Sequence, residues 1–411
     1  MIFAAMVGTL LLLQFWRRQP IGIALLGGAI AGALVAGQGL PIRHLVEGMF
    51  TYIDPIIIIF TAMLFMKVLE ENGALGELAG SIIRLFGKQP LLLVISMTLF
   101  IMFPAMLTGI TTTSVLTTGA LMAAPLVSLG VERTRVATLI AVVSVMGMLA
   151  PPINLLAMLI GQGVDMPYIG FELPLLAVTV PVALLASFWL AYPTLRKANL
   201  ELAFNSLPHP TRRSKALLFM PLVVVFGLMI AVRVLPQYLP DVGIPLIFMA
   251  GSILGLMTGK KVPFVRTSYR ALRLALPVLG LLAGVGAFLQ IMTLTGVRGL
   301  LVVTVLALPV TLKYVGLAIS LPLFGGVSAF ASAMVFGVPF LLGLLGGNEV
   351  AVCAAISILA GLGDVLPPSA INARFAAQVT GGVELKHVIL KALPFVLITA
   401  IAAVSIIIFA H

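Results

Sequence analysis

The sequence predicts an all-α membrane protein of two inverted-topology repeats, each with five membrane spans and one re-entrant hairpin, and with broken helices at the membrane midplane. Hydrophobic residues make up 61% of the 411 residues and charged residues only 9%, too little polar material to coat a water-soluble globule. Paired breaks in matching positions of two halves indicate a transporter's binding site. Such a pattern occurs twice, 216 positions apart: Gly109, Gly130, Gly147, Pro151, Pro152 and Gln162 recur as Gly325, Gly346, Gly363, Pro367, Pro368 and Gln378.

The first repeat is expected to cover residues 1–194. About twenty apolar residues cross the hydrocarbon core, and five runs approach that length, near 2–16, 20–38, 52–69, 134–150 and 173–193. The first run has no basic residue before it and no cleavage site after it, so we interpret it as a retained span and not as a signal peptide. Residues 89–128, centred on FPAMLTGITTTSVL, predict a hairpin, and residues 134–163 predict a broken helix.

The second repeat, residues 216–411, follows a polar linker at 195–215, which we expect to be cytoplasmic. It repeats the plan with spans near 216–234, 243–258, 275–294, 350–364 and 389–409. A hairpin is expected within about 305–345, with LFGGVSAF at its tip, and a second broken helix at 350–380. The segments 42–50 and 262–274 mix charges with apolar residues at helical spacing, which predicts interfacial helices that brace a scaffold. Ordinary solvated loops are the alternative.

The distribution of charge supports this topology. Because five crossings is an odd number, the second repeat enters the membrane from the opposite face. With the N-terminus outside, 19 of the 24 Lys and Arg residues fall on the inner face, as the positive-inside rule requires. The net charge of +11 is therefore interpreted as a signal of orientation. We expect no nucleic-acid partner, because the basic residues lie in short segments without interleaved aromatic residues.

The hairpin tips combine exposed backbone with hydroxyl groups. A non-helical break at membrane depth persists only where protein or a water-filled cavity surrounds it. Free carbonyls at such a break suit a cation, and free N–H groups suit an anion. In the first tip, Gly109 precedes four hydroxyls that could cap the new helix or bind sodium: Thr111, Thr112, Thr113 and Ser114. Capping or bonding within the helix is the purely structural alternative. The second tip offers Gly325, Gly326 and Ser328.

Each Pro-Pro pair predicts a helix, a break and a new helix, because proline cannot continue the preceding helix but suits the first turn of the next. After Pro151 and Pro152, the Asn154 amide could bind substrate oxygen or a cation. Pro367 and Pro368 are followed in the same way by Ser369 and Asn372. A sodium site is therefore expected to draw on these oxygen-bearing residues: Thr111, Thr112, Thr113, Asn154, Ser328 and Asn372.

Two charges flank the second Pro-Pro break, where ionisable groups are costly and usually face a cavity. Asp364 is a candidate cation or proton site. Arg374 is a candidate for a substrate carboxylate, which a guanidinium can hold with two parallel hydrogen bonds. A structural pairing of these residues with each other or with backbone is equally compatible with the sequence.

At these residues the chain resembles the large membrane subunit of tripartite ATP-independent periplasmic (TRAP) transporters, within the ion-transporter superfamily of elevator-type carriers. The likeness spans nearly the whole chain and is strongest in GALMAAPLVSLGVERTRVATLIAVVSVMGMLAPPINLLAMLIG and in LPPSAINARF…GGVELKHVILKALPFVLI. It implies sodium-driven uptake of an organic anion of the carboxylate or C4-dicarboxylate class, across a bacterial inner membrane. It also implies a periplasmic binding protein and a small membrane subunit as partners, and a transport domain that moves against a scaffold.

The sequence departs from the family pattern at several positions, and these departures are compatible with other classes of carrier. TGITTTS replaces a Ser-Gly-Ser-Ala-like tip, Ile153 follows the first Pro-Pro pair where Ser is common, and Arg374 occupies a normally apolar position. A proton-coupled or stand-alone carrier, or an exporter, is the alternative that these departures leave.

Other functional classes fit the sequence less well. No Walker A motif occurs, since GLMTGKK at 255–261 has the wrong spacing. An intramembrane enzyme would need a histidine near Ser114 or Ser328, whereas the histidines fall in predicted loops or ends: His44, His209, His387 and His411. A channel with fixed hairpins is a further rival. No cofactor is expected, and the single Cys353 is interpreted as a packing residue.

Overall fold

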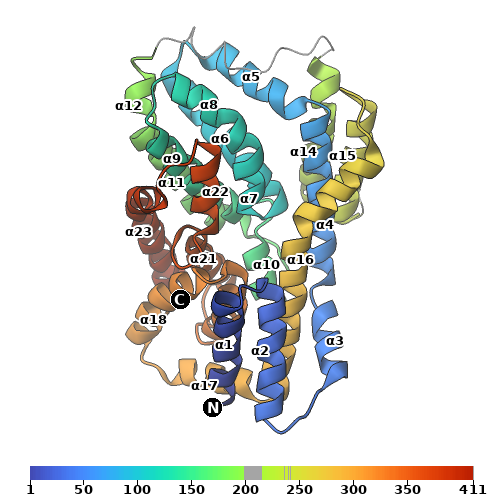
Figure 1. Cartoon of the computed structure of the whole chain (residues 1–411), viewed down its shortest axis with the longest axis vertical. Helices are drawn as coiled ribbons and strands as arrows, with labels where there is room; N and C mark the ends of the chain where they lie inside the picture. Colours follow the sequence, from blue (N-terminus) through green and yellow to red (C-terminus); the bar gives the residue numbers. More distant parts are fainter. Residues whose placement is uncertain (199–214, 236, 239, 241, 411) are drawn as a thin grey trace.

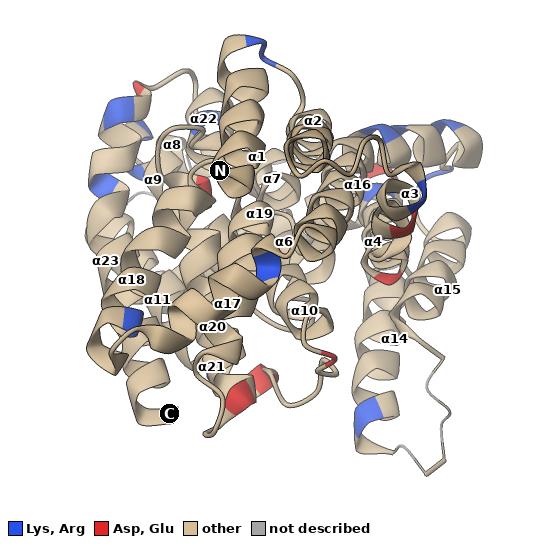
Figure 2. Cartoon of the chain, turned by 90° about the horizontal axis from the view of Figure 1, so that it is seen from below, with Lys and Arg blue, Asp and Glu red and all other residues tan. Residues whose placement is uncertain are grey.

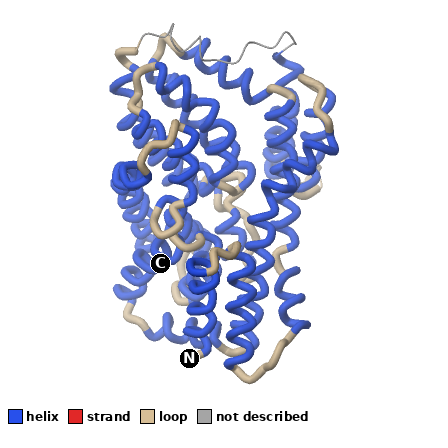
Figure 3. The backbone as a smooth tube through the Cα atoms, viewed as in Figure 1, coloured by secondary structure: helices blue, strands red, loops and turns tan. Residues whose placement is uncertain are grey.

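The computed structural model describes residues 1–411 except 199–214, 236, 239, 241 and 411. Most of the predicted linker at 195–215, and also His209 and His411, therefore lie outside the described residues. Within the described ranges the chain consists of helices joined by loops, with no strand (Figure 3).

In the first half, the helices before the first hairpin are α1 (Ile2–Leu11), continued by a π-helical turn (Leu12–Trp16), α2 (Ile21–Val35), α3 (Ile42–Phe50), α4 (Ile53–Glu71) and α5 (Ala74–Phe86). The predicted hairpin range contains α6 (Pro90–Thr108), α7 (Thr111–Ser114), a π-helical turn (Val115–Gly119) and α8 (Ala120–Ser128). After it come α9 (Arg133–Leu149), α10 (Leu155–Gln162), α11 (Glu172–Leu190) and α12 (Tyr192–Leu195).

The second half has the same order of elements. It begins with α14 (Lys215–Val234), α15 (Ile244–Met257), α16 (Phe264–Leu294) and α17 (Val297–Ala307). The second hairpin consists of α18 (Val310–Gly325), α19 (Ala329–Ser332), a π-helical turn (Ala333–Gly337) and α20 (Val338–Leu342). The chain ends with α21 (Glu349–Gly361), a 3-10 turn (Leu362–Val365), α22 (Ile371–Val379) and α23 (Leu385–Ala410).

Local sequence explains the helix ends that matter for function. α6 begins with Pro90 at its first position and ends at Gly109, whose φ of +64° favours glycine. α9 ends at Leu149, just before its Pro-Pro pair, since proline cannot continue the helix. α21 ends earlier, at Gly361, and a 3-10 turn leads from it toward Pro367. Each pair is followed by a short new helix, α10 or α22.

Five of the described helices are long and apolar enough to cross a membrane by length and composition, and a sixth can if α3 and α4 form one span. The five are α6, α11, α14, α16 and α23. Other apolar helices fall short of that length. α9 has 17 residues and stops at its proline pair, and α21 has 13 and passes into a 3-10 turn before the second pair.

The two segments predicted as interfacial helices differ. Residues 42–50 form a separate helix, α3, which meets α4 at 45°. Pro55 lies in the first turn of α4, where it prevents a continuous helix across the junction. Residues 264–274 instead continue without a break into the following span as the 31-residue helix α16. No glycine or proline occurs from Phe264 to Leu276, and Pro277, which follows, lies inside α16 without ending it.

The helices form two packing groups. We call α1–α4 and α14–α16 the frame, because α16 packs against α2, α3 and α4, and α15 packs against α4 and α14. We call α6–α11 and α18–α23 the hairpin group, in which α9 packs against α6, α11, α22 and α23. α5 and α17 connect the groups. Figures 1 and 2 both show α4, α15 and α16 on one side of the molecule and α9, α11, α18 and α23 on the other.

Candidate functional site

The two hairpins approach the middle of the molecule from different ends. Figure 1 shows α6 and α8 in its upper half, α17 and α18 in its lower half, and α10 and α21 between them. The tips and the two Pro-Pro breaks lie together in the hairpin group, so the structure places the predicted site residues in one region.

The first tip contacts the first break through the Leu155 side chain and one backbone hydrogen bond. A Cβ on Gly109 would collide with the Leu155 side chain at the start of α10, so the glycine allows this close approach. The backbone N–H of Ile153 donates to the Met106 carbonyl over 3.2 Å. These contacts hold the loop after Pro152 against the end of α6.

The second tip contacts the second break through backbone. Cβ atoms on Gly325 and Gly326 would collide with the carbonyl oxygens of Ala360 and Pro367, respectively. Ser369 donates both its backbone N–H, over 3.0 Å, and its hydroxyl to the Gly326 carbonyl. Ser328 is the N-cap of α19, and its hydroxyl accepts the Ala331 N–H over 3.2 Å.

The first tip also reaches the second break. The Thr111 hydroxyl donates to Asp364 Oδ2 over 2.8 Å. Asp364 follows α21 in the 3-10 turn that leads to Pro367 and Pro368. One hydrogen bond therefore joins a hydroxyl of the first half to the carboxylate of the second half.

The two asparagines after the breaks connect the halves in both directions. The Asn154 amide donates to Leu149 O and to Ser357 Oγ, each over 3.0 Å, and its Oδ1 caps α10 by accepting the Ala157 N–H over 3.0 Å. Asn154 is the N-cap of α10, one position before the first turn of the helix. Asn372 Nδ2 donates to the Ala141 carbonyl on α9 over 2.6 Å.

The two amides differ in what they leave unbonded. Both asparagines are fully buried. Asn154 has both ends of its amide engaged, whereas Asn372 Oδ1 has no hydrogen-bond partner in the described part of the chain. A buried oxygen without a partner is costly unless it meets a ligand or water. Asn372 Oδ1 is thus the amide oxygen best placed to meet a ligand.

The hydroxyl cluster of the first tip divides into two kinds. Ser114 donates across the hairpin to Ile101 O, and Thr113 donates to Met63 Sδ over 3.3 Å. Those two hydroxyls are engaged by other helices of the protein and neither cap α7 nor bond within it. Thr111 faces Asp364, and Thr112 is half-buried. The second hairpin repeats the cross-arm bond with Ser332, which donates to Leu321 O over 2.7 Å.

Arg374 is exposed and donates to the Pro368 carbonyl over 3.3 Å. Asp364 is engaged by Thr111, so these two charges are held by different partners. The guanidinium therefore remains accessible beside the second break.

Some polar residues at the site carry no sequence signal. The Tyr168 hydroxyl accepts the Asn154 N–H over 3.1 Å, and Gln14 donates to Val327 O of the second tip over 3.4 Å. Tyr168 lies in an irregular loop, and Gln14 lies in an apolar span. Neither belongs to the duplicated pattern, so the sequence could not have identified them.

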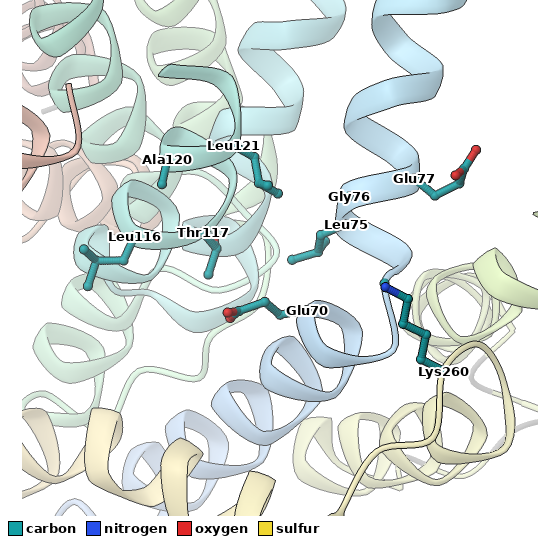
Figure 4. Close-up of a pocket in the computed structure, with 10 residues that line it drawn as sticks. Glu70, Leu75, Gly76, Glu77, Leu116, Thr117, Ala120, Leu121 and Lys260 are labelled. Atoms are coloured by element: carbon teal, nitrogen blue, oxygen red, sulfur yellow. The ribbon is translucent and has the colours of Figure 1, made fainter. Parts of the chain in front are cut away.

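Three cavities lie between the frame and the hairpin group. One, of about 360 Å³, separates the α4–α5 junction and Lys260 from the second arm of the first hairpin. In Figure 4, Glu70 points toward Leu116 and Thr117. A second, of about 780 Å³, is lined by Pro152 and Tyr168 on one side and by α14 and α15 on the other. A third, of about 190 Å³, lies between Tyr52, α16 and the end of α10.

Few polar contacts cross between the two groups. Gln162 donates to Thr51 O over 2.9 Å, and Arg233 of α14 pairs with Glu172 of α11. The Gln14–Val327 and Thr113–Met63 hydrogen bonds also cross between the groups, and Arg298 of the connecting helix α17 donates to Gly163 O over 2.6 Å. Packing between the groups is sparse compared with packing inside each group. The interface is therefore partly open and weakly bonded.

Comparisons with known proteins match this architecture. Residues 7–411 match the family model described as "Tripartite ATP-independent periplasmic transporter, DctM component". Among solved structures, the fold is similar to that of the YdaH transporter of Alcanivorax borkumensis, with a TM-score of 0.60 and 16% sequence identity over 89% of this chain and 86% of that chain. No curated protein matches the sequence.

Proposed function

Because this chain belongs to the DctM family of tripartite ATP-independent periplasmic transporters, we propose that it takes up an organic anion, of the carboxylate or dicarboxylate class, together with sodium. It is a multi-pass membrane component of a secondary transporter and not an enzyme. The N-terminus is proposed to lie outside a bacterial inner membrane. The carrier is proposed to consist of two inverted repeats, 1–194 and 216–411.

The observation that carries the proposal is the Thr111–Asp364 hydrogen bond between the first tip and the second break. The helix that carries Asn372, α22, packs against α7, which carries Thr111, and against the 3-10 turn that carries Asp364. Their oxygens are of the kind that bind small cations, and Asn372 Oδ1 has no partner in the described residues. A sodium ion here would join both halves of the site. Arg374, exposed beside the same break, is proposed to hold a carboxylate of the substrate.

The mechanism proposed is elevator-like, with the hairpin group moving against the frame. Support comes from dense packing inside each group and sparse packing between them. The tips and breaks contact each other inside the hairpin group, so the site can travel as one body. Rearrangement then requires breaking only the few polar contacts between the groups.

The partners proposed are a periplasmic binding protein that delivers the substrate and a small membrane subunit. The alternative is a stand-alone or proton-coupled carrier, or an exporter, because the TGITTTS tip and Arg374 depart from the family pattern. The proposed site would have the same location in each of these alternatives.

The test begins with thermal stability of the purified protein across mono- and dicarboxylates, each in sodium and in potassium, since a ligand of the folded state raises stability. A sodium-dependent shift with one acid class is expected. Uptake by proteoliposomes, with and without the binding protein and small subunit, then identifies the partners. Uptake driven by a proton gradient and indifferent to sodium would refute sodium coupling. Absence of substrate counterflow would favour a channel.

A further inference from the structure

The segment at 260–276, which we call the basic segment, is a charged surface that the transport proposal does not use. It contains five cations and no acidic residue, and all five cations are exposed: Lys260, Lys261, Arg266, Arg270 and Arg273. Residues from Phe264 onward form the first three turns of α16. Figure 2 shows bands of Lys and Arg along the end of α16 that projects from the edge of the molecule.

The helix sorts these residues into three stripes. Thr267, Ala271 and Ala275, at spacings of four, are buried, and Ala271 packs against Leu64 and Val68 of α4. Arg266, Arg270 and Arg273, at spacings of four and three, share a second face. A third face is apolar and exposed, with Val265 at 82% and Tyr269 at 65% exposure, followed by Leu272 and Leu276.

Among the described residues, Arg270 alone of the three arginines in the basic stripe has an ion-pair partner. Arg270 donates to Glu71 Oε1 of α4 over 2.8 Å, and Thr267 donates to the other oxygen of the same carboxylate over 2.5 Å. Arg266 and Arg273 form no ion pair within the part of the chain that the structure describes. Two guanidinium groups therefore lie free beside an apolar face.

A shallow hollow of about 600 Å³ adjoins Arg266. It is lined by apolar side chains except for that guanidinium: Pro263, Phe264, Val265, Arg266 and Tyr269. The same helix continues into a stretch that is apolar enough to cross a membrane. The hollow and the free arginines thus lie at the end of a span, where lipid headgroups are found.

We propose that the basic segment binds an anionic phospholipid, with its phosphate on Arg266 and Arg273 and its acyl chains along the exposed apolar face that continues toward the span through Leu272 and Leu276. Arginine suits phosphate because its planar group donates two parallel hydrogen bonds. Clustered cations on an amphipathic helix at a span's end attract anionic lipid. An acidic soluble protein fits less well, since it would leave Val265 and Tyr269 uncovered.

The test compares phosphatidylglycerol with phosphatidylcholine of the same acyl chains, added to the purified protein in detergent, with the thermal midpoint as the readout. Phosphatidylglycerol is expected to raise the midpoint of the wild type more than phosphatidylcholine does. The apparent affinity of the R266Q/R273Q variant for phosphatidylglycerol is expected to fall about tenfold or more. Glycerol 3-phosphate, which is a headgroup without acyl chains, is expected to give no shift.

The matched control is K88Q/K386Q, which removes two exposed cations elsewhere and is expected to keep the wild-type response. R266K/R273K keeps the charge and is expected to lose less affinity than the glutamine variant. Equal shifts with both lipids, an unchanged response in R266Q/R273Q, or an equal loss in K88Q/K386Q would overturn the proposal. If the double variant is unstable in phosphatidylcholine, R266Q and R273Q are measured singly, and wild-type affinity in both overturns it.

Discussion

The two hairpin tips face comparable breaks but contact them by different means. Besides one backbone hydrogen bond, from the Ile153 N–H to the Met106 carbonyl, the first tip uses side chains, because Gly109 accommodates Leu155, and Thr111 reaches Asp364. The second tip uses mainly backbone, because Gly325 and Gly326 lie directly against the peptide units of the second break. The duplicated pattern has therefore produced tips with different contacts, although Gly147, the counterpart of Gly363, also lies directly against backbone, at Met102.

The difference determines what each contact tolerates. A flexible side chain such as Leu155 can shift when volume is added opposite it, whereas a peptide unit held in helices at both ends cannot. The second contact should therefore be intolerant of volume, and the first should be sensitive mainly to the loss of polar groups. The largest effects are expected from added volume at the second break.

Gly363→Ala tests the backbone contact. Its Cβ would meet the backbone of Gly325, and overpacking against an immobile partner costs about 3 kcal/mol or more. A large drop in the thermal midpoint, or loss of folded protein, is expected. Gly109→Ala should cost less, about 1–2 kcal/mol, from the left-handed backbone with relaxation of Leu155.

Gly227→Ala is the matched control, since Gly227 is an exposed helix residue in α14 with nothing within 4 Å of its added Cβ. The midpoint of this variant should be unchanged or raised, because alanine favours a helix. Equal drops in the thermal midpoint for Gly363→Ala and Gly109→Ala would contradict the distinction between the two contacts.

Asn154→Ala and Asn372→Ala sharpen the comparison at the amides. Asn154 makes three side-chain hydrogen bonds, so its loss should destabilise by about 2–4 kcal/mol, including the lost helix cap. The Asn372 side chain makes one hydrogen bond, so Asn372→Ala is expected to lower the stability by about 1 kcal/mol. If Asn372 Oδ1 binds sodium, its variant should instead lose sodium-dependent uptake. Thermal midpoints and sodium titrations of both variants separate stability from binding. A larger loss of stability in Asn372→Ala than in Asn154→Ala would contradict the structural role given to Asn154.

Sequence reasoning identified the breaks and tips because proline, glycine and periodic apolar runs act locally. It could not foresee that Thr111 of one half meets Asp364 of the other, since a repeat gives no information about which tip contacts which break. The continuity of α16 was also missed, because charged residues within the first turns of a long helix look like an interfacial segment. Tyr168 gave no signal, since an isolated tyrosine in a loop has no periodicity.

Thr111→Val should raise the sodium concentration for half-maximal uptake about tenfold, the scale of one charge-assisted hydrogen bond. The substitution removes the donor to Asp364 but keeps the shape. Thr112→Val tests whether the neighbouring hydroxyl is a sodium ligand, and it should raise that concentration without loss of folded protein. Thr304→Val is a control, since Thr304 is exposed and bonds only within α17. Unchanged sodium dependence in both site variants would remove the hydroxyls from the proposed cation site.

Arg374 should give the smallest effect on stability and a selective effect on binding. Because the side chain is exposed and donates to a single carbonyl, that of Pro368, Arg374→Gln should leave the thermal midpoint nearly unchanged. Arg374→Lys keeps the charge but loses the two-pronged geometry, so anion affinity should fall in the lysine variant and fall further in the glutamine variant. A ligand-titrated thermal shift measures both at fixed sodium. Wild-type affinity in both variants would show that the substrate carboxylate is bound elsewhere and not by Arg374.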